Sequence, residues 1–158
     1  MELLRQLNKF TKSTKDKIHI YKTYVRSVVE QSCVVWSSNL TTKNIKELER
    51  VQKVAISLIT NNKKTYQENM KHLNIETLTE RRNILSKRFA DKCIKNPKTT
   101  DMFKKRTIKH NMKIQNQNKY HVQKINTVRR QKSAIPQMTN YLNVKNKQIK
   151  DNQRTKAN

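Results

Sequence analysis

Basic side chains recur at helical spacing along three stretches of the chain, and this pattern has the clearest chemical meaning in the sequence. The rows are Lys22 and Arg26; Lys43, Lys46, Arg50 and Lys53; and Arg81, Arg88, Lys92 and Lys95. Steps of three, four and seven residues place a row on one face of a helix, from which cations can contact successive phosphates of a nucleic acid. The alternative is that each row is simply the solvated face of an amphipathic helix.

Few carboxylates lie near these rows in the sequence to neutralise them. They are Glu47, Glu49, Glu80 and Asp91. We therefore expect at least one row to bind nucleic acid, although the spacing alone does not decide which one.

The residues that usually perform catalysis do not gather into a recognisable pattern. Metal-dependent polymerases and nucleases need several carboxylates that converge on divalent cations, yet none of the four aspartates has an acidic neighbour. Glu47 and Glu49 are two residues apart and so point to different sides of a helix. The four histidines and two cysteines form no close pair at the spacing of a zinc site. We predict no catalytic residue, no metal site, no cofactor and no enzymatic activity of this chain on its own.

The overall charge indicates a polyanionic partner. The 158 residues include 36 Lys and Arg but only 11 Asp and Glu, which gives a formal net charge of +25. RNA, DNA or an RNA–DNA hybrid is the default partner for such a surface, and an anionic membrane surface is the weaker alternative. No apolar run approaches the roughly 18 residues of a membrane span, and the N-terminus lacks the apolar stretch of a signal peptide. We expect an intracellular protein, in the nucleus or in a cytoplasmic ribonucleoprotein.

The elements that would position these residues are predicted to be helices. The chain contains no glycine, so tight hairpins are disfavoured and backbone positions with positive φ must be taken by residues such as Asn. Apolar residues at helical spacing predict a first helix over residues 3–10 and a second that continues for about six turns to Trp36. Further helices are predicted after Thr41, Thr65 and Thr77, each of which can serve as an N-cap. Asn61 is expected to end one of them and the Asn96-Pro97 pair to end the last.

Composition divides the chain into a domain and a tail. Residues 1–103 hold most of the aromatic and β-branched residues, whereas residues 104–158 carry 15 basic residues, Arg129 and Arg130 among them, against one acidic residue. We predict an all-α protein, with a small bundle of about five helices over residues 1–103 followed by a largely disordered basic tail over residues 104–158. An apolar island near residues 133–143 is expected to be a short docking segment rather than a long helix. Tyr120 and Tyr141 could stack on bases or serve as anchors.

Several stretches, taken in order, resemble one family. Residues 20–30 (IYKTYVRSVVE) and 32–41 (SCVVWSSNLT) are similar to the region after the palm in the reverse transcriptases of non-LTR, LINE-type (Jockey- or CR1-like) retrotransposons. The similarity continues through residues 48–53 (LERVQK), 78–82 (LTERR) and 89–93 (FADKC). It returns at residues 133–136 (SAIP) and 141–143 (YLN), which resemble the C-terminal motif of the family.

The resemblance implies a thumb and C-terminal extension without the polymerase palm. In this family the thumb is a helical bundle that helps to hold the primer–template, so the chain would grip an RNA–DNA hybrid and would not form bonds. The remaining polymerase domains would be further partners if the chain belongs to a longer product. The palm motif with its paired aspartates has no counterpart in this sequence. The alternative is a relic open reading frame of a decayed transposon, with no activity of its own.

Overall fold

The described part of the protein is built from helices. A computed structural model describes residues 5–6, 9, 13–61, 65–106 and 118–155. Within these ranges the regular structure consists of helices and one isolated antiparallel bridge between Lys105 and Tyr120, which confirms the all-α class. The apolar residues that predict a helix over residues 3–10 (Leu3, Leu4, Leu7 and Phe10) lie outside the described residues. None of the described helices is long and apolar enough to cross a membrane.

The chain forms two compact units that do not follow the expected boundary between residues 103 and 104. Unit 1 comprises Met1–Cys33 and Leu40–Asn83, and unit 2 comprises Val34–Asn39 and Ile84–Asn158. The reason is helix α7 (Leu78–Lys95), which is long enough to contribute its first turns to unit 1 and the rest to unit 2.

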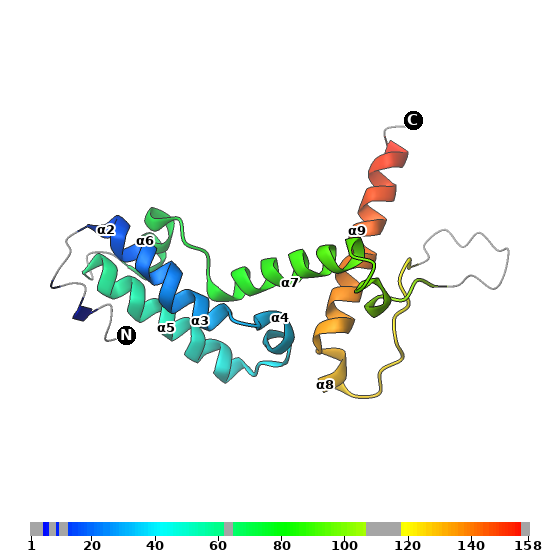
Figure 1. The fold of residues 1–158 in the computed structure, drawn as a ribbon, viewed down its shortest axis with the longest axis horizontal. Helices are drawn as coiled ribbons and strands as arrows, with labels where there is room; N and C mark the ends of the chain where they lie inside the picture. Colours follow the sequence, from blue (N-terminus) through cyan, green and yellow to red (C-terminus); the bar gives the residue numbers. More distant parts are fainter. Residues whose placement is uncertain (1–4, 7–8, 10–12, 62–64, 107–117, 156–158) are drawn as a thin grey trace. The chain divides into compact units, whose positions relative to one another are not determined.

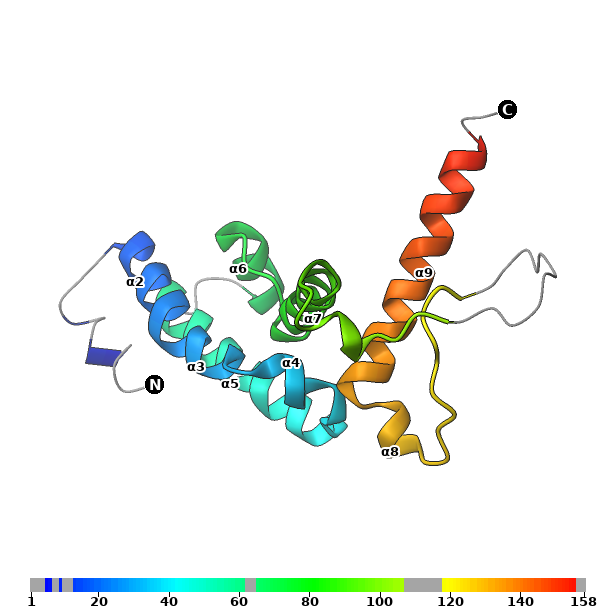
Figure 2. The ribbon, with the colours of Figure 1, turned by 45° about the vertical axis from the view of Figure 1, so that its right-hand side comes forward.

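Unit 1 is assembled from a continuous N-terminal helical stretch and two further helices. The stretch consists of α2 (Thr14–Ile20), the π-helical segment η1 (Tyr21–Arg26) and α3 (Ser27–Glu30). Helix α2 packs beside α5 (Thr42–Thr60), and α6 (Tyr66–Leu73) also packs against α5 (Figure 1 and Figure 2).

Local capping sets the ends of these helices where the sequence predicts them. The hydroxyl of Thr41 accepts a hydrogen bond from the backbone N–H of Asn44 at 3.3 Å, and Thr65 and Thr77 each form a reciprocal capping box with the glutamate three residues later. Asn61 ends α5 with φ 53°, as expected for a chain without glycine.

The helix expected to run to Trp36 is interrupted. The π-helical segment adds one residue to its turn and so rotates the face that follows it, and Val28 on the next turn is 70% exposed. The backbone then breaks at Ser32, which has φ 51°, before the short helix α4 (Cys33–Trp36) begins.

The core of unit 1 is organised around a buried glutamine. The apolar cluster contains Tyr21, Ala55, Ile56, Ile59 and Ile75. Within it the fully buried Gln52 accepts a hydrogen bond from the Tyr21 hydroxyl at 3.0 Å and donates to the Tyr66 hydroxyl and to the Glu76 carbonyl, at 3.3 and 2.9 Å. Burial also raises the pKa of the Tyr21 and Tyr66 hydroxyls above the ordinary value, so both stay protonated as this network requires.

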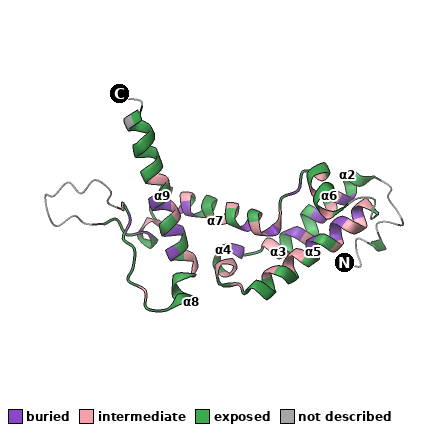
Figure 3. Ribbon diagram, turned by 180° about the vertical axis from the view of Figure 1, so that it is seen from behind, coloured by how far each residue is buried: buried purple, intermediate pink, exposed green. Residues whose placement is uncertain are grey.

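Unit 2 contains the later part of α7, the 3₁₀ segments η2 (Ser37–Asn39) and η3 (Thr100–Met102), and two C-terminal helices. These are α8 (Val128–Gln131) and α9 (Ala134–Thr155). Ala90, Cys93, Phe103, Tyr120, Met138 and Leu142 form its buried core. Figure 3 shows buried positions on the N-terminal half of α9 and exposed positions over most of its C-terminal half.

Helix α9 corrects the expectation that the residues near 133–143 form a short docking segment rather than a long helix. Pro136 does not prevent the helix, because it lies in the first turn, where a backbone N–H would have no helical acceptor. Met138 and Leu142 are buried against residues from α7 and from the segment that contains Phe103. That burial compensates for the ordering of a segment that is too poor in apolar residues to fold alone.

Asn143 fastens an extended segment to α9. Its side-chain oxygen accepts from the Tyr120 N–H at 2.9 Å, and its side-chain nitrogen donates to the Tyr120 carbonyl at 3.2 Å. Asn143 is 4% exposed and Tyr120 is 2% exposed, so water does not replace these bonds. Tyr120 is therefore an anchor of the core rather than a side chain free to stack on bases.

We expect Asn143→Ala to lower the free energy of unfolding by about 2–3 kcal/mol, because it leaves two buried backbone groups without partners. Asn140→Ala, on an exposed position of the same helix, is the matched control and should change stability by less than about 0.5 kcal/mol. Thermal denaturation followed by circular dichroism at 222 nm compares the two variants. Equal melting temperatures would contradict a clamping role for Asn143.

Candidate nucleic-acid interface

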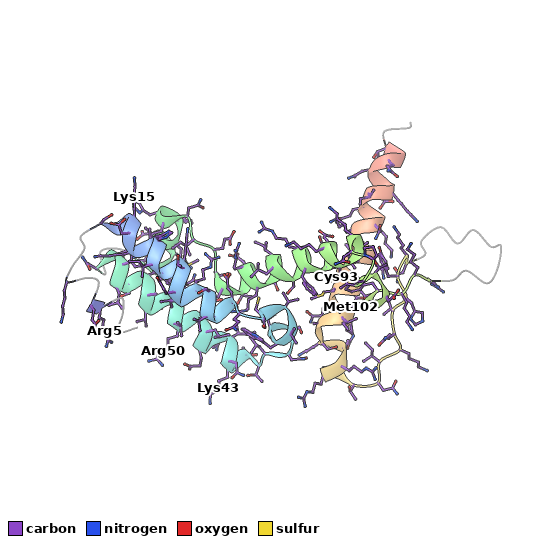
Figure 4. All side chains as sticks on the ribbon, in the orientation of Figure 1. Arg5, Lys15, Lys43, Arg50, Cys93 and Met102 are labelled. Carbon is purple, nitrogen blue, oxygen red and sulfur yellow. The ribbon has the colours of Figure 1, made fainter. Side chains whose placement is uncertain are left out.

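Helix α5 presents the most complete of the predicted basic rows. Because Thr41 fixes where the helix begins, Lys43, Lys46, Arg50 and Lys53 fall at steps of three, four and three residues. All four are exposed. Figure 4 shows Lys43 and Arg50 projecting from the same side of α5. The row therefore forms a continuous basic face on one helix of unit 1.

Carboxylates neutralise this face only weakly. Arg50 lies 3.9 Å from Glu47, and both side chains of that pair are more than half exposed, so the pair contributes little stability and competes little with a phosphate. In the described ranges, Lys43, Lys46 and Lys53 form no salt bridge.

Glu49, the other acidic residue of this part of α5, has a different task. Its carboxylate accepts hydrogen bonds from the backbone N–H of Thr79 at 2.8 Å and from that of Leu78 at 3.3 Å, and from the Thr79 hydroxyl at 2.8 Å. These groups lie at the beginning of α7, where a carboxylate is stabilised by free N–H groups and by the helix dipole. Glu49 therefore joins two helices, a role that sequence spacing does not reveal.

Only one residue of the N-terminal pair Lys22 and Arg26 is exposed. Lys22 is exposed, as expected. Arg26 instead is 8% exposed and pairs with Glu30 at 2.6 Å and with Glu76 at 3.5 Å. Its position in the π-helical segment directs it into the unit, so the structure makes Arg26 a buried ion-pair residue, not a phosphate contact.

The α7 row is divided between the two units. Arg81 belongs to unit 1, where it is half-buried and lies 3.3 Å from Glu30. Arg88, Lys92 and Lys95 belong to unit 2 and are exposed at steps of four and three residues. These three remain a basic face, whereas Arg81 contributes mainly to the Glu30 ion-pair cluster.

The basic pair of α8 is open to solvent. Arg129 and Arg130 are both exposed in unit 2. The Thr127 hydroxyl accepts from the Arg130 backbone N–H at 3.4 Å and so caps this short helix. The two guanidinium groups thus remain candidates for phosphate contact.

A further cluster in unit 2 was not predicted from the sequence. Lys145 lies 2.7 Å from Asp91, and Lys87 and Lys145 lie 5.6 and 5.7 Å from the centroid of the Tyr141 ring. The hydrogen bond to Asp91 raises the pKa of Lys145. Tyr141 is thus an aromatic residue flanked by cations, although its spacing to Lys145 (i, i+4 on α9) is the only part of the cluster that the sequence could have indicated.

Arg82 shows that the spacing of apolar residues does not by itself predict which side chains of α7 are buried. Its side chain is 3% exposed, one guanidinium nitrogen donates to the Thr79 hydroxyl at 3.1 Å, and the Nη1 atom has no partner among the described residues. Desolvation lowers the pKa of this guanidinium, while Glu49 and Glu30 oppose that change. Phe89 is 39% exposed, whereas its neighbour Ala90 is fully buried.

The residues that could perform catalysis are dispersed or buried. Among the described residues, no three His, Cys, Asp or Glu side chains lie together in a way that could hold a metal ion. Cys33 and Cys93 are free and buried, and burial raises the pKa of the Cys33 thiol. Their environment is the opposite of the one that activates a nucleophilic thiolate.

No family model matches the chain, and neither a curated protein nor a solved structure matches it.

Proposed function

We propose that the chain is a non-catalytic nucleic-acid-binding protein that holds the backbone of an RNA–DNA hybrid through the exposed face of α5. The observation that carries the proposal is the row Lys43, Lys46, Arg50 and Lys53, which is exposed along one helix and, within the described part of the chain, has one weak carboxylate partner. In a chain with a net charge of +25, such a row attracts phosphates and releases their counterions on binding.

The proposal also assigns the chain to a larger enzyme. We propose that the chain corresponds to the thumb and C-terminal extension of a LINE-type reverse transcriptase, on the strength of the ordered sequence resemblance. It would then work in a nuclear or cytoplasmic ribonucleoprotein beside the remaining polymerase domains. Tyr24 and Val28, four residues apart and 62% and 70% exposed, are consistent with an apolar surface that meets another part of such an enzyme.

Two buried clusters support the interpretation that the chain is a folded protein, and they count against the alternative of an inert relic. Each unit has its own apolar core, and in both a buried amide side chain is satisfied by specific partners. A relic under no selection would be expected to lose such buried hydrogen bonds first, because one unsatisfied buried polar group costs about 1–3 kcal/mol.

Fluorescence anisotropy of a labelled RNA–DNA hybrid at several salt concentrations tests the function. Four phosphate contacts predict a slope of log affinity against log salt of about −3 to −4. Undetectable binding at low salt, or binding that salt does not weaken, would overturn the proposal. Vesicles of anionic lipid serve as a parallel test, and leakage of their contents at sub-micromolar protein would favour a membrane-surface protein instead.

A further inference from the structure

An apolar groove lies beside the basic row of unit 1. Its volume is about 670 Å³, within the roughly 300–1,000 Å³ of sites that take small molecules. Ile45, Val54, Leu58 and Tyr66 supply apolar lining, and Lys46, Arg50 and Lys53 lie among the lining residues from α5. The groove therefore combines a surface that favours flat apolar groups with three of the cations described above.

The acidic residue in the groove does not cancel this charge. Glu49 belongs to the lining, but its oxygens are engaged with the backbone of Leu78 and Thr79. Among the residues that the structure describes, Glu47 pairs with Arg50, at 3.9 Å. An anionic ligand thus meets cations that are largely available.

Tyr66 is held in place within this lining. Its hydroxyl accepts from the side-chain nitrogen of Gln52 at 3.3 Å, and Gln52 is fixed in the core by its bonds to Tyr21 and to Glu76. An aromatic side chain held in this way loses little conformational entropy when a flat group packs against it. Base–aromatic stacking of this kind is tolerant of base identity.

We infer that this groove binds unpaired nucleotides, with bases against the apolar lining and phosphates on Lys46, Arg50 and Lys53. The inference rests on the proposed nucleic-acid-binding function and specifies its ligand further. A duplex presents phosphates but keeps its bases stacked, so it reaches the cations and not the lining. A single strand can turn its bases outward and use both. The protein therefore prefers a single-stranded segment, such as one that adjoins a hybrid, at this position.

Three labelled oligonucleotides of equal length separate the contributions: oligo(dT), a backbone of the same charge that lacks bases, and a blunt duplex. Oligo(dT) is expected to bind the wild-type chain about tenfold more tightly than the abasic backbone, a modest value for the stacking of one base. If the two bind equally, the inference fails while the proposed function stands. If none of the three binds at low salt and the labelled RNA–DNA hybrid does not bind either, the proposed function itself fails.

A lining variant supplies the structural control. Ile45→Ser together with Val54→Ser removes apolar lining and retains every cation, so the preference for oligo(dT) should vanish while affinity for the abasic backbone is unchanged. Val28→Ser, at an exposed valine of the same unit, should leave the preference intact. Circular dichroism checks that both variants fold. If the lining variant does not fold, the comparison of oligo(dT) with the abasic backbone on the wild-type chain still tests the inference. A Leu/Glu amphipathic peptide that competes fully with oligo(dT) and loses affinity in the lining variant would make the groove a peptide site and overturn the inference.

Discussion

Replacing Gln52 by alanine is expected to lower the free energy of unfolding by about 3–5 kcal/mol. The substitution removes three hydrogen bonds at a position that is 0% exposed, and it leaves the Tyr21 hydroxyl and the Glu76 carbonyl without partners. It also opens a cavity between α5 and the residues around it. Small domains have a total stability of roughly 5–15 kcal/mol, so a loss of this size removes between about a fifth and all of it and should clearly lower the midpoint of chemical denaturation.

Two comparisons assign this loss to its cause. Gln67→Ala, at an exposed position of α6, should change stability by less than about 0.5 kcal/mol. Gln52→Leu fills most of the space without making the hydrogen bonds, so it should fall between Gln52→Ala and the wild type. Chemical denaturation followed by circular dichroism gives the three values. A wild-type chain without a cooperative helical transition would contradict the fold-based prediction and would favour the relic.

Local chemistry explains why the helices could be predicted well. The positions of Thr41, Thr65, Thr77 and Asn61 are set by contacts within four residues of each cap, so the sequence alone contains the necessary information. The same holds for the α5 row, since one well-capped helix places all its cations on one face. This part of the candidate site followed from the sequence.

Long-range contacts explain where prediction stopped. Arg26 pairs with Glu76, and Arg81 pairs with Glu30, each across about fifty residues of sequence, and no spacing rule brings such residues together. The length of α9 depended in the same way on a buried surface supplied by Ala90 and Cys93. A π-helical turn is also invisible to a pattern with a period of 3.6 residues, and it rotated Val28 out of the core.

Replacing the four cations of α5 by glutamine is expected to weaken binding of the RNA–DNA hybrid by at least about 100-fold at low salt. The variant combines Lys43→Gln, Lys46→Gln, Arg50→Gln and Lys53→Gln. Each cation that contacts a phosphate adds about one unit to the salt slope, so the slope should become shallower by about 3 to 4. Glutamine has a helix propensity similar to that of lysine and arginine, and all four positions are exposed, so α5 should keep its structure and the loss should reflect charge alone.

A second variant with the same net charge locates the effect. Arg88→Gln, Lys92→Gln, Lys95→Gln and Lys98→Gln remove four exposed charges from and just after α7, so any general loss of attraction between the protein and a polyanion is equal in the two variants. If α5 is the principal contact, the fold-loss of hybrid affinity in the α7 variant should be less than about a tenth of the fold-loss in the α5 variant. The α7 variant should also keep most of the salt slope. The reverse order would assign the backbone contact to α7, and equal losses would mean that the hybrid responds to net charge rather than to the α5 face. Anisotropy titrations of both variants distinguish these results, and circular dichroism verifies that both fold. The titrations can do so because a helix face contacts defined phosphates, whereas net charge acts through a field that salt screens within about 10 Å.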